Sequence, residues 1–150
     1  MVKTCCVTGH RDISAEKTEY VRQSLIREVG NAAADGYTHF ITGFAEGADM
    51  LFAEVVAELK SRTDGITLEA AIPYRRCCER LKSNSLLLVC DDVKVVSEAY
   101  YGGCYAKRNA YMVRQSERVI AVYDGREKGG TYNTIKLARK KGKNLHVIYI

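Results

Sequence analysis

Hydrophobic residues in this chain gather in short continuous runs that are separated by longer amphipathic segments. Runs of this kind, bounded by glycine, proline or polar residues, are typical of strands buried on both faces of a parallel sheet. The sequence predicts six such strands: Val2 to Thr8, Thr38 to Thr42, Thr67 to Ile72, Val93 to Val96, Arg118 to Tyr123 and Leu145 to Ile150. We expect Pro73 to end the third strand, because proline cannot continue a sheet ladder.

Between the strands, apolar residues recur every three or four positions, which predicts helices with one buried stripe. The first helix is capped by Ser14 and ends at Gly36. Further helices are predicted around Leu51 to Leu59, Ala106 to Gln115 and Thr131 to Lys141. From Cys77 to Asp92 we predict a helix, although Leu86 to Cys90 also suits a short strand. Tyr74 to Arg76 and Ser97 to Tyr105 are predicted as loops.

The alternation of strand and helix predicts an α/β fold, a three-layer sandwich with a mostly parallel sheet of about six strands flanked by helices. A chain of 150 residues suits one domain, residues 1–150. In such a sheet, ligands bind beyond the carboxyl ends of the strands, where the winding direction reverses. Candidate site residues are therefore expected in the loops that follow the strands.

The composition narrows the class of protein. Hydrophobic residues make up 47% and charged residues 27% of the chain, and no apolar run approaches the length of a membrane span. We therefore expect a cytoplasmic protein without a membrane partner. The net charge of +5 owes much to five cations: Lys136, Arg139, Lys140, Lys141 and Lys143. Either a solvated last helix or an acidic ligand, nucleic acid included, explains this cluster.

The six cysteines do not have the spacing of a metal site. The neighbouring pairs Cys5–Cys6 and Cys77–Cys78 lack the two-residue separation of zinc ribbons and redox motifs, and the first pair lies in a predicted buried strand. We predict reduced thiols. Asp124 has no second carboxylate or histidine beside it in the sequence, so we also predict no metal and no cofactor.

A glycine pair marks the strongest candidate for ligand binding. Gly129 and Gly130 follow the predicted strand that ends at Tyr123 and open the helix that carries Thr131 and Thr134 in its first turn. Glycines there let backbone N–H groups face an anion at the positive end of the helix, and the two threonines can add hydroxyl donors. The alternative is that the pair only makes a tight turn.

Other loops and the helix starts beside them supply further candidates. Gly9, His10 and Arg11 follow the first strand, where His10 suits either acid–base chemistry or loop capping and Arg11 suits a phosphate. Gly43 and Gly47 permit close backbone approach after the second strand. Asp49 suits either a hydrogen bond to a ribose hydroxyl or stabilisation of the helix dipole, and Asp124 suits sugar hydroxyls. Arg108 suits either a ligand contact or a surface salt bridge, and Asn109 suits hydrogen bonds that fix a neighbouring loop. Three tyrosines suit either base stacking or packing at a loop edge: Tyr100, Tyr101 and Tyr105.

Five of these segments in this order resemble the YpsA-like branch of the SLOG superfamily. They are Thr8 to Arg11, Gly43 to Asp49, Arg108 to Met112, Val119 to Gly125 and Gly129 to Thr134. The resemblance covers nearly the whole chain. It implies a Rossmann-like domain that binds nucleotides or nucleotide-derived ligands, with the lonely-guy phosphoribohydrolases and the single-stranded DNA-loading DprA proteins as relatives.

The hydrolases' motifs are matched only in part. Their R-K-x-x-M motif resembles Arg108 to Met112, which implies a phosphate or sugar contact for Arg108. Of their P-G-G-x-G-T-x-x-E motif, Gly129 and Gly130 match, Lys128 replaces the proline, and the catalytic glutamate has no counterpart. Cleavage of an N-glycosidic bond needs a carboxylate to stabilise the cationic sugar and activate water. Asp124, Glu127, Asp49 and Glu54 are the candidates to replace it.

Three hypotheses follow from the sequence. The leading one is a nucleotide or nucleotide-derivative binder in a sensor or regulatory role, with the ligand phosphate against Gly129, Gly130 and Thr131. The second is an N-glycoside hydrolase acting on a nucleoside monophosphate. Single-stranded DNA binding is third, because no broad basic stripe lies outside the last helix. Since superfamily relatives often pair, we also expect a homo-oligomer, for which a helix face near Tyr111 and Met112 is available.

Overall fold

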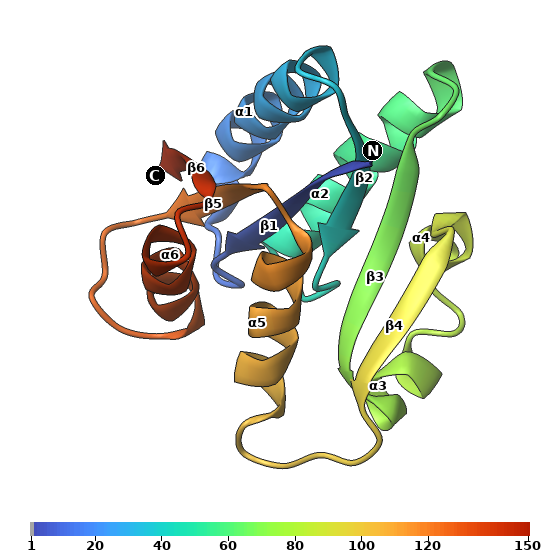
Figure 1. The fold of residues 1–150 in the computed structure, drawn as a ribbon, viewed down its shortest axis with the longest axis vertical. Coiled ribbons are helices and arrows are strands. Elements are labelled where there is room, and N and C mark those ends of the chain that lie inside the picture. Colours follow the sequence, from blue (N-terminus) through green and yellow to red (C-terminus); the bar gives the residue numbers. More distant parts are fainter. Residues whose placement is uncertain (1) are drawn as a thin grey trace.

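A single parallel sheet forms the middle layer of the protein. The structure is a computed structural model and describes residues 2–150. The six strands are β1 Lys3–Gly9, β2 Tyr37–Thr42, β3 Thr67–Tyr74, β4 Asp92–Ser97, β5 Arg118–Tyr123 and β6 Asn144–Tyr149. They are ordered β4-β3-β2-β1-β5-β6, and every neighbouring pair is parallel (Figure 1). The predicted three-layer α/β sandwich is confirmed.

Six helices cover the two faces of the sheet. They are α1 Ala15–Ala34, α2 Ala48–Arg62, α3 Arg75–Arg80, α4 Ser85–Val89, α5 Cys104–Gln115 and α6 Gly130–Lys140. Alternate residues of each strand point to opposite faces, so β1 divides its two cysteines. Cys5 packs in the core beneath α1 and α2, whereas Cys6 packs in a second core beneath α5 and α6.

The winding direction reverses beside β1, which lies between β2 and β5 in Figure 1. From β1 the chain adds β2, β3 and β4 in one direction, and it then crosses back to place β5 on the other side of β1. Because the connections on the two sides leave in opposite directions, the loops after β1 and β5 diverge and leave a crevice at their carboxyl ends.

Two sequence predictions are wrong around β3. The strand does not stop at Pro73 but continues to Tyr74, which pairs with Ser97 of β4. Its pairing with β2 ends at Thr42 and Ala70, so Pro73 costs no hydrogen bond to that neighbour. The segment from Tyr74 to Arg76 is also not a loop, because α3 begins at Arg75.

The helix predicted from Cys77 to Asp92 is two short helices. Asn84 separates them: its side chain accepts a hydrogen bond from Leu86 N at 2.9 Å and so caps α4. Leu86 is therefore helical, as predicted. The loop predicted to reach Tyr105 is shorter than expected, since α5 begins at Cys104.

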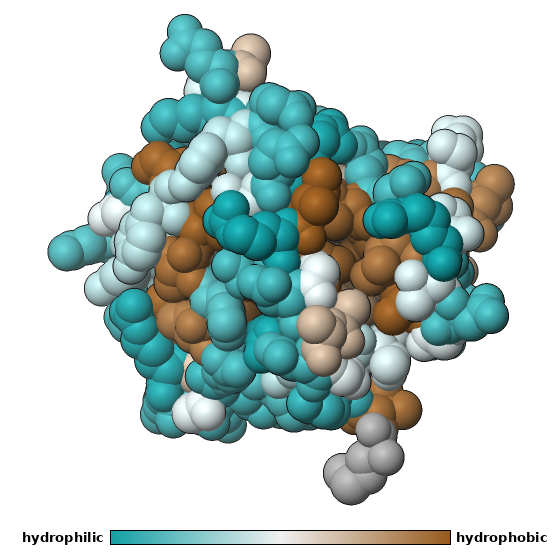
Figure 2. Space-filling view, turned by 90° about the horizontal axis from the view of Figure 1, so that it is seen from above, coloured by the Kyte–Doolittle hydropathy of each residue, from teal (hydrophilic) through white to brown (hydrophobic). Residues whose placement is uncertain are grey.

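No helix within residues 2–150 has both the length and the apolar character needed to cross a membrane. Figure 2 shows that hydrophobic side chains on the visible face lie in patches interrupted by hydrophilic ones.

Candidate functional site

The crevice beside β1 holds a cavity of about 370 Å³. Its walls come from the end of β1, from the loops after β1, β2 and β5, and from the N-terminal parts of α2, α5 and α6. The lining residues are Val7, Thr8, Gly9, His10, Arg11, Asp12, Ala45, Asp49, Tyr105, Arg108, Asn109, Arg126, Lys128, Gly129, Gly130 and Thr131. The fold thus brings together residues from four of the loops that the sequence singled out.

The start of α6 presents backbone donors to this cavity. Gly129 is the N-cap at φ 93°, and no side chain of residues 2–150 caps the helix. Asn133 N bonds to Gly129 O at 3.0 Å, so the amides of Gly130, Thr131 and Tyr132 precede the first intrahelical hydrogen bond. A Cβ at Gly129 would meet no atom within 4 Å, so the space beside this residue is open. Glycine is favoured here because of the positive φ and not because of crowding. This is the geometry of an anion site.

The two threonines of this turn play different parts. Thr131 lines the cavity. Thr134 does not, and its hydroxyl donates to Gly130 O at 2.7 Å. Its hydrogen is therefore committed to the helix backbone, and of the two predicted hydroxyl donors only Thr131 faces the candidate site.

Cationic side chains surround the start of α6, and they differ in whether a carboxylate already pairs with them. Arg11 is exposed, lies 5.2 Å over the Tyr105 ring, and forms no ion pair or side-chain hydrogen bond with residues 2–150. Lys128 is likewise unpaired within the described residues. Arg126 instead holds Asp124 at 2.6 Å and Asp12 at 3.2 Å. Arg11 and Lys128 are therefore the cavity-lining cations that no carboxylate of the described residues engages.

Arg108 is neither a surface salt bridge nor a freely solvated cation. It is 4% exposed and its Nη1 donates to Gly43 O at 2.7 Å and Ala71 O at 3.1 Å, while Nε donates to Asn109 Oδ1 at 2.8 Å. Burial lowers its pKa, and the nearby Asp49 carboxylate opposes that shift. Its Nη2 makes no hydrogen bond within residues 2–150, so Arg108 ties the loop to the sheet and keeps one donor for the cavity.

Asp49 is the buried carboxylate of the cavity wall. It is 7% exposed, and its Oδ2 accepts from Ala45 N at 3.3 Å. Burial raises its pKa to about 6, against the opposing charge of Arg108. Asp49 can therefore hold or release a proton near neutral pH, which neither of its sequence interpretations anticipated.

His10 has the partner that the sequence could not identify. Its Nε2 accepts from Asp124 N at 3.1 Å, and its ring stacks on Tyr123 at 5.9 Å between centroids. Burial lowers the pKa of His10, so the ring is neutral at pH 7 and fixes the loop after β5. Hydrogen bonds from Arg126 lower the pKa of Asp124 to about 2. Asp124 is thus an ionised loop anchor outside the cavity lining.

The glycines of the first two loops are packed against protein atoms. A Cβ at Gly9 would lie 2.3 Å from Ala48 Cβ, and one at Gly43 would lie 2.6 Å from Asp49 Oδ2. At Gly47, where φ is 79°, the Cβ would lie 2.4 Å from His10 O. These glycines permit the loops to pack on one another. Gly9 also lines the cavity, whereas Gly43 and Gly47 do not.

Some predicted residues lie outside the cavity, and some residues of the cavity were not predicted. Glu127 is exposed and lies outside the cavity lining, as does Glu54, which pairs with Arg22. Tyr100 and Tyr101 are also exposed, and Tyr100 packs on Tyr74. Sequence reasoning missed six lining residues: Val7, Thr8, Asp12, Ala45, Arg126 and Lys128. Their positions at the end of the first strand and within the three selected loops that carry Arg11, Gly43 and Gly129 were the available signal.

A second cavity of about 420 Å³ adjoins the first. The two share Arg11, Ala45, Tyr105 and Arg108. Beyond these residues the second cavity is walled by Tyr74, Cys77 and Arg80 among others. Tyr105 lines both cavities, and the second also has the aromatic rings of Phe44 and Tyr74 in its wall.

Comparison with known proteins gives a family. The sequence profile of the YspA SLOG family (YpsA) matches residues 5–150. A UPF0398 protein of Bacillus cereus (strain G9842) is 23% identical over 166 aligned residues, which cover 99% of this chain and 90% of the relative. A UPF0398 protein of Bacillus thuringiensis (strain Al Hakam) gives the same values.

Two solved structures share the fold. DNA processing protein A from Helicobacter pylori, which binds single-stranded DNA, superposes with a TM-score of 0.67 at 19% identity over 97% of this chain. The chain spans 64% of that protein. The structural genomics target TM1055 superposes with a TM-score of 0.65 at 18% identity, over 96% of this chain and 72% of the target. These likenesses support the Rossmann-like fold predicted from the sequence resemblance.

Proposed function

The chain belongs to the YspA SLOG family, and from this premise we propose that it binds a nucleotide or nucleotide-derived ligand in the cavity beside β1. One observation carries the proposal: the uncapped start of α6 opens into the cavity at the point where the sheet reverses its winding. Backbone amides and the positive end of the helix favour a phosphate there.

The surrounding residues orient the rest of the ligand. Arg11 and Lys128 supply charge to the phosphate, and Arg108 adds its remaining donor. Tyr105 lines both cavities, so a base reaching past it would contact this ring and enter the adjoining cavity, where Tyr74 packs edge-on against Tyr105 at 6.2 Å between centroids. A role as a sensor or regulatory partner suits a site that offers donors and cations to a ligand, in a chain where the catalytic glutamate of the hydrolases has no counterpart.

Native mass spectrometry of the purified protein with a panel of nucleotides, cyclic nucleotides and nucleotide sugars tests the proposal. We expect an intact ligand retained on the wild type and lost from Gly130→Leu, whose side chain would occupy the open space above the helix start. Gly102→Leu is the matched control, because that glycine also faces open space but lies outside the cavity. Equal retention by both variants would overturn the placement.

N-glycoside hydrolysis of a nucleoside monophosphate is the second candidate. It is favoured by Asp49, a buried carboxylate in the cavity whose pKa of about 6 suits acid–base chemistry. In the same experiment, hydrolysis would leave a sugar phosphate and free base. Asp49→Asn should then remove turnover, whereas Asp124→Asn and Glu127→Gln, outside the cavity lining, should retain it.

Single-stranded DNA binding is the third candidate. The Helicobacter pylori neighbour and the exposed Arg11 beside Tyr105 favour it. Fluorescence anisotropy with a labelled oligothymidylate would show a steep loss of affinity with salt if phosphates dominate binding. Unmeasurable binding at low salt would exclude this candidate.

A further inference from the structure

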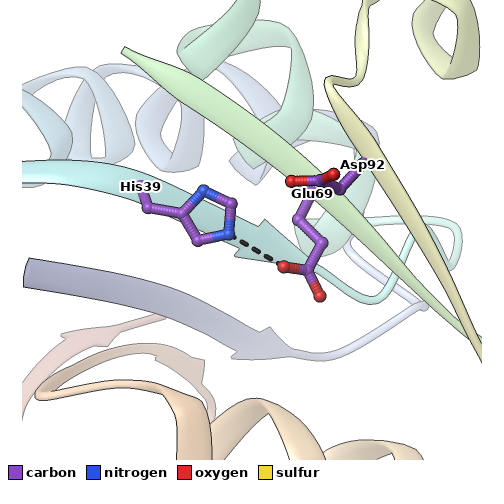
Figure 3. Close-up of side chains that lie close together, drawn as sticks. All are labelled: His39, Glu69 and Asp92. Atoms are coloured by element: carbon purple, nitrogen blue, oxygen red, sulfur yellow. Dashed lines mark hydrogen bonds and ion pairs between the residues drawn. The ribbon is translucent and has the colours of Figure 1, made fainter. Parts of the chain in front are cut away.

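A second cluster of polar side chains lies at the amino end of the sheet, away from the cavity. His39 comes from β2, Glu69 from β3 and Asp92 from β4 (Figure 3). The strand register places them together, because Glu69 is opposite Asp92 and His39 is opposite Thr67. One ligand atom from each residue lies within 4.8 Å of the others.

The imidazole of His39 is oriented by a hydrogen bond at the ring nitrogen that points away from the carboxylates. Its Nδ1 lies 2.7 Å from Thr67 Oγ1, and that hydroxyl donates to Thr38 O at 3.4 Å. With Nδ1–H directed to the hydroxyl, Nε2 faces the two carboxylates. Metal-binding histidines are typically oriented in this way, by a hydrogen bond at the nitrogen that does not bind the ion.

The two carboxylates differ in their environment. The Glu69 side chain is 9% exposed; its Oε2 accepts from Tyr111 OH at 2.5 Å, and its Oε1 lies 2.8 Å from His39 Nε2. The tyrosine thus fixes one oxygen and leaves the other directed at the histidine. Asp92 is exposed and forms no side-chain hydrogen bond or ion pair with residues 2–150. Its carboxylate is free to take up an ion.

We propose that His39, Glu69 and Asp92 bind a divalent first-row transition ion. One imidazole nitrogen and two carboxylate oxygens suit such ions better than Mg²⁺ or Ca²⁺, which prefer oxygen alone, and water would complete the coordination. The ion takes the place of the proton shared by Nε2 and Oε1, and that proton leaves to solvent. Binding would join three neighbouring strands and fasten the edge strand β4 to the sheet.

The positive charge of Lys94 opposes this binding. Lys94 lies two residues after Asp92 on the same face of β4, and its Nζ is 5.8 Å from the centre of the Tyr111 ring. Removal of this charge should strengthen ion binding without altering any ligand. Lys94→Gln therefore gives a test whose expected sign is opposite to that of the ligand variants.

Titration of the chelator-treated full chain with Co²⁺ and Zn²⁺ tests the proposal. We expect one ion per chain, with Co²⁺ visible absorption that lacks the near-ultraviolet charge-transfer band of thiolate ligands. Asp92→Asn should weaken binding about tenfold or more, and His39→Gln should abolish it, whereas Lys94→Gln should tighten it a few-fold. Asp64→Asn, another exposed aspartate without a partner in the described residues, is the control.

Asp92→Asn keeps the test decisive, because Asp92 has no partner in residues 2–150 and its loss should leave the metal-free protein folded. Asp92→His should restore binding by supplying a nitrogen ligand. Absence of stoichiometric binding by the wild type, a thiolate band, or equal affinity in wild type and Asp92→Asn would each overturn the proposal.

Discussion

The loops after β2 and β5 both contain two glycines and lead into a helix, yet the structure uses them in different ways. In the first loop, a Cβ at Gly47 would lie 2.4 Å from His10 O, so backbone atoms of another loop occupy the space beside this glycine. In the second, a Cβ at Gly129 would meet nothing within 4 Å. Both residues have positive φ.

The difference separates two meanings of a glycine in a strand-to-helix loop. A glycine surrounded by protein atoms lets two loops approach each other, and its role is stability. A glycine with the same dihedral preference but open space above it leaves backbone amides accessible, and its role is compatible with a ligand. The comparison yields four expectations for stability, from the largest effect to the smallest.

Gly47→Ala should have the largest effect. The new Cβ combines a backbone conformation disfavoured for alanine with a clash against the backbone of His10 and Arg11. We expect a loss of about 4 kcal/mol in the free energy of unfolding. Urea denaturation followed by circular dichroism measures it, and a loss below about 1 kcal/mol would show that the first loop is not tightly packed.

Asp49→Asn should remove a pH dependence from the same loop. Since burial raises the folded-state pKa of Asp49 from 3.8 to about 6, the folded protein binds more protons than the unfolded chain between these values. The free energy of unfolding therefore falls as pH rises, by about 3 kcal/mol from this group in total, of which about 2 kcal/mol is lost between about pH 4 and pH 6. Denaturation of wild type and variant at both pH values gives the difference. Parallel pH profiles would contradict the assigned burial.

Gly129→Ala should cost less, because strain is its main penalty. With φ at 93° and no atom near the new Cβ, we expect a loss of about 1 to 2 kcal/mol. Thermal and urea unfolding measure it. A loss as large as that of Gly47→Ala would remove the distinction between the loops.

Gly130→Ala should have the smallest effect. Gly130 does not have a positive φ, and the nearest atom to its new Cβ would be Asn109 Nδ2 at 3.7 Å. We expect a change within about 0.5 kcal/mol. The same denaturation series provides the value, and a large destabilisation would mean that the helix start is packed and not open.

Much of the fold could be predicted because strand and helix leave local patterns. All six strands and the four longer helices follow from apolar runs and helical spacing. The region around β3 and β4 was predicted only in part: Leu86 is helical as expected, but the break at Asn84 and the continuation of β3 past Pro73 were not predicted. The helices there are short, and Pro73 is tolerated because the pairing of β3 with β2 ends at Ala70. That condition depends on where a neighbouring strand stops.

The loops that form the candidate site could be predicted from the sequence, whereas the contacts of individual side chains could not. Gly9, Arg11, Gly130 and Thr131 do meet at one cavity, because parallel strands bring their carboxyl ends to one edge. For Arg108 the sequence predicts either a ligand contact or a surface salt bridge, and neither interpretation includes the inward turn of its side chain to the carbonyls of Gly43 and Ala71. Such partners are distant in sequence and leave no periodic signal.

The sequence by itself determined the layers, the parallel sheet and the edge at which the candidate site lies, because periodicity and glycine placement are local properties. Only the tertiary structure decided the chemistry of individual groups. It buried Asp49 near Arg108, paired His10 with Asp124, and aligned His39, Glu69 and Asp92 across three strands. A side chain's burial and partners, which set its charge and its free donors, arise from strand register and loop packing that the local pattern does not encode.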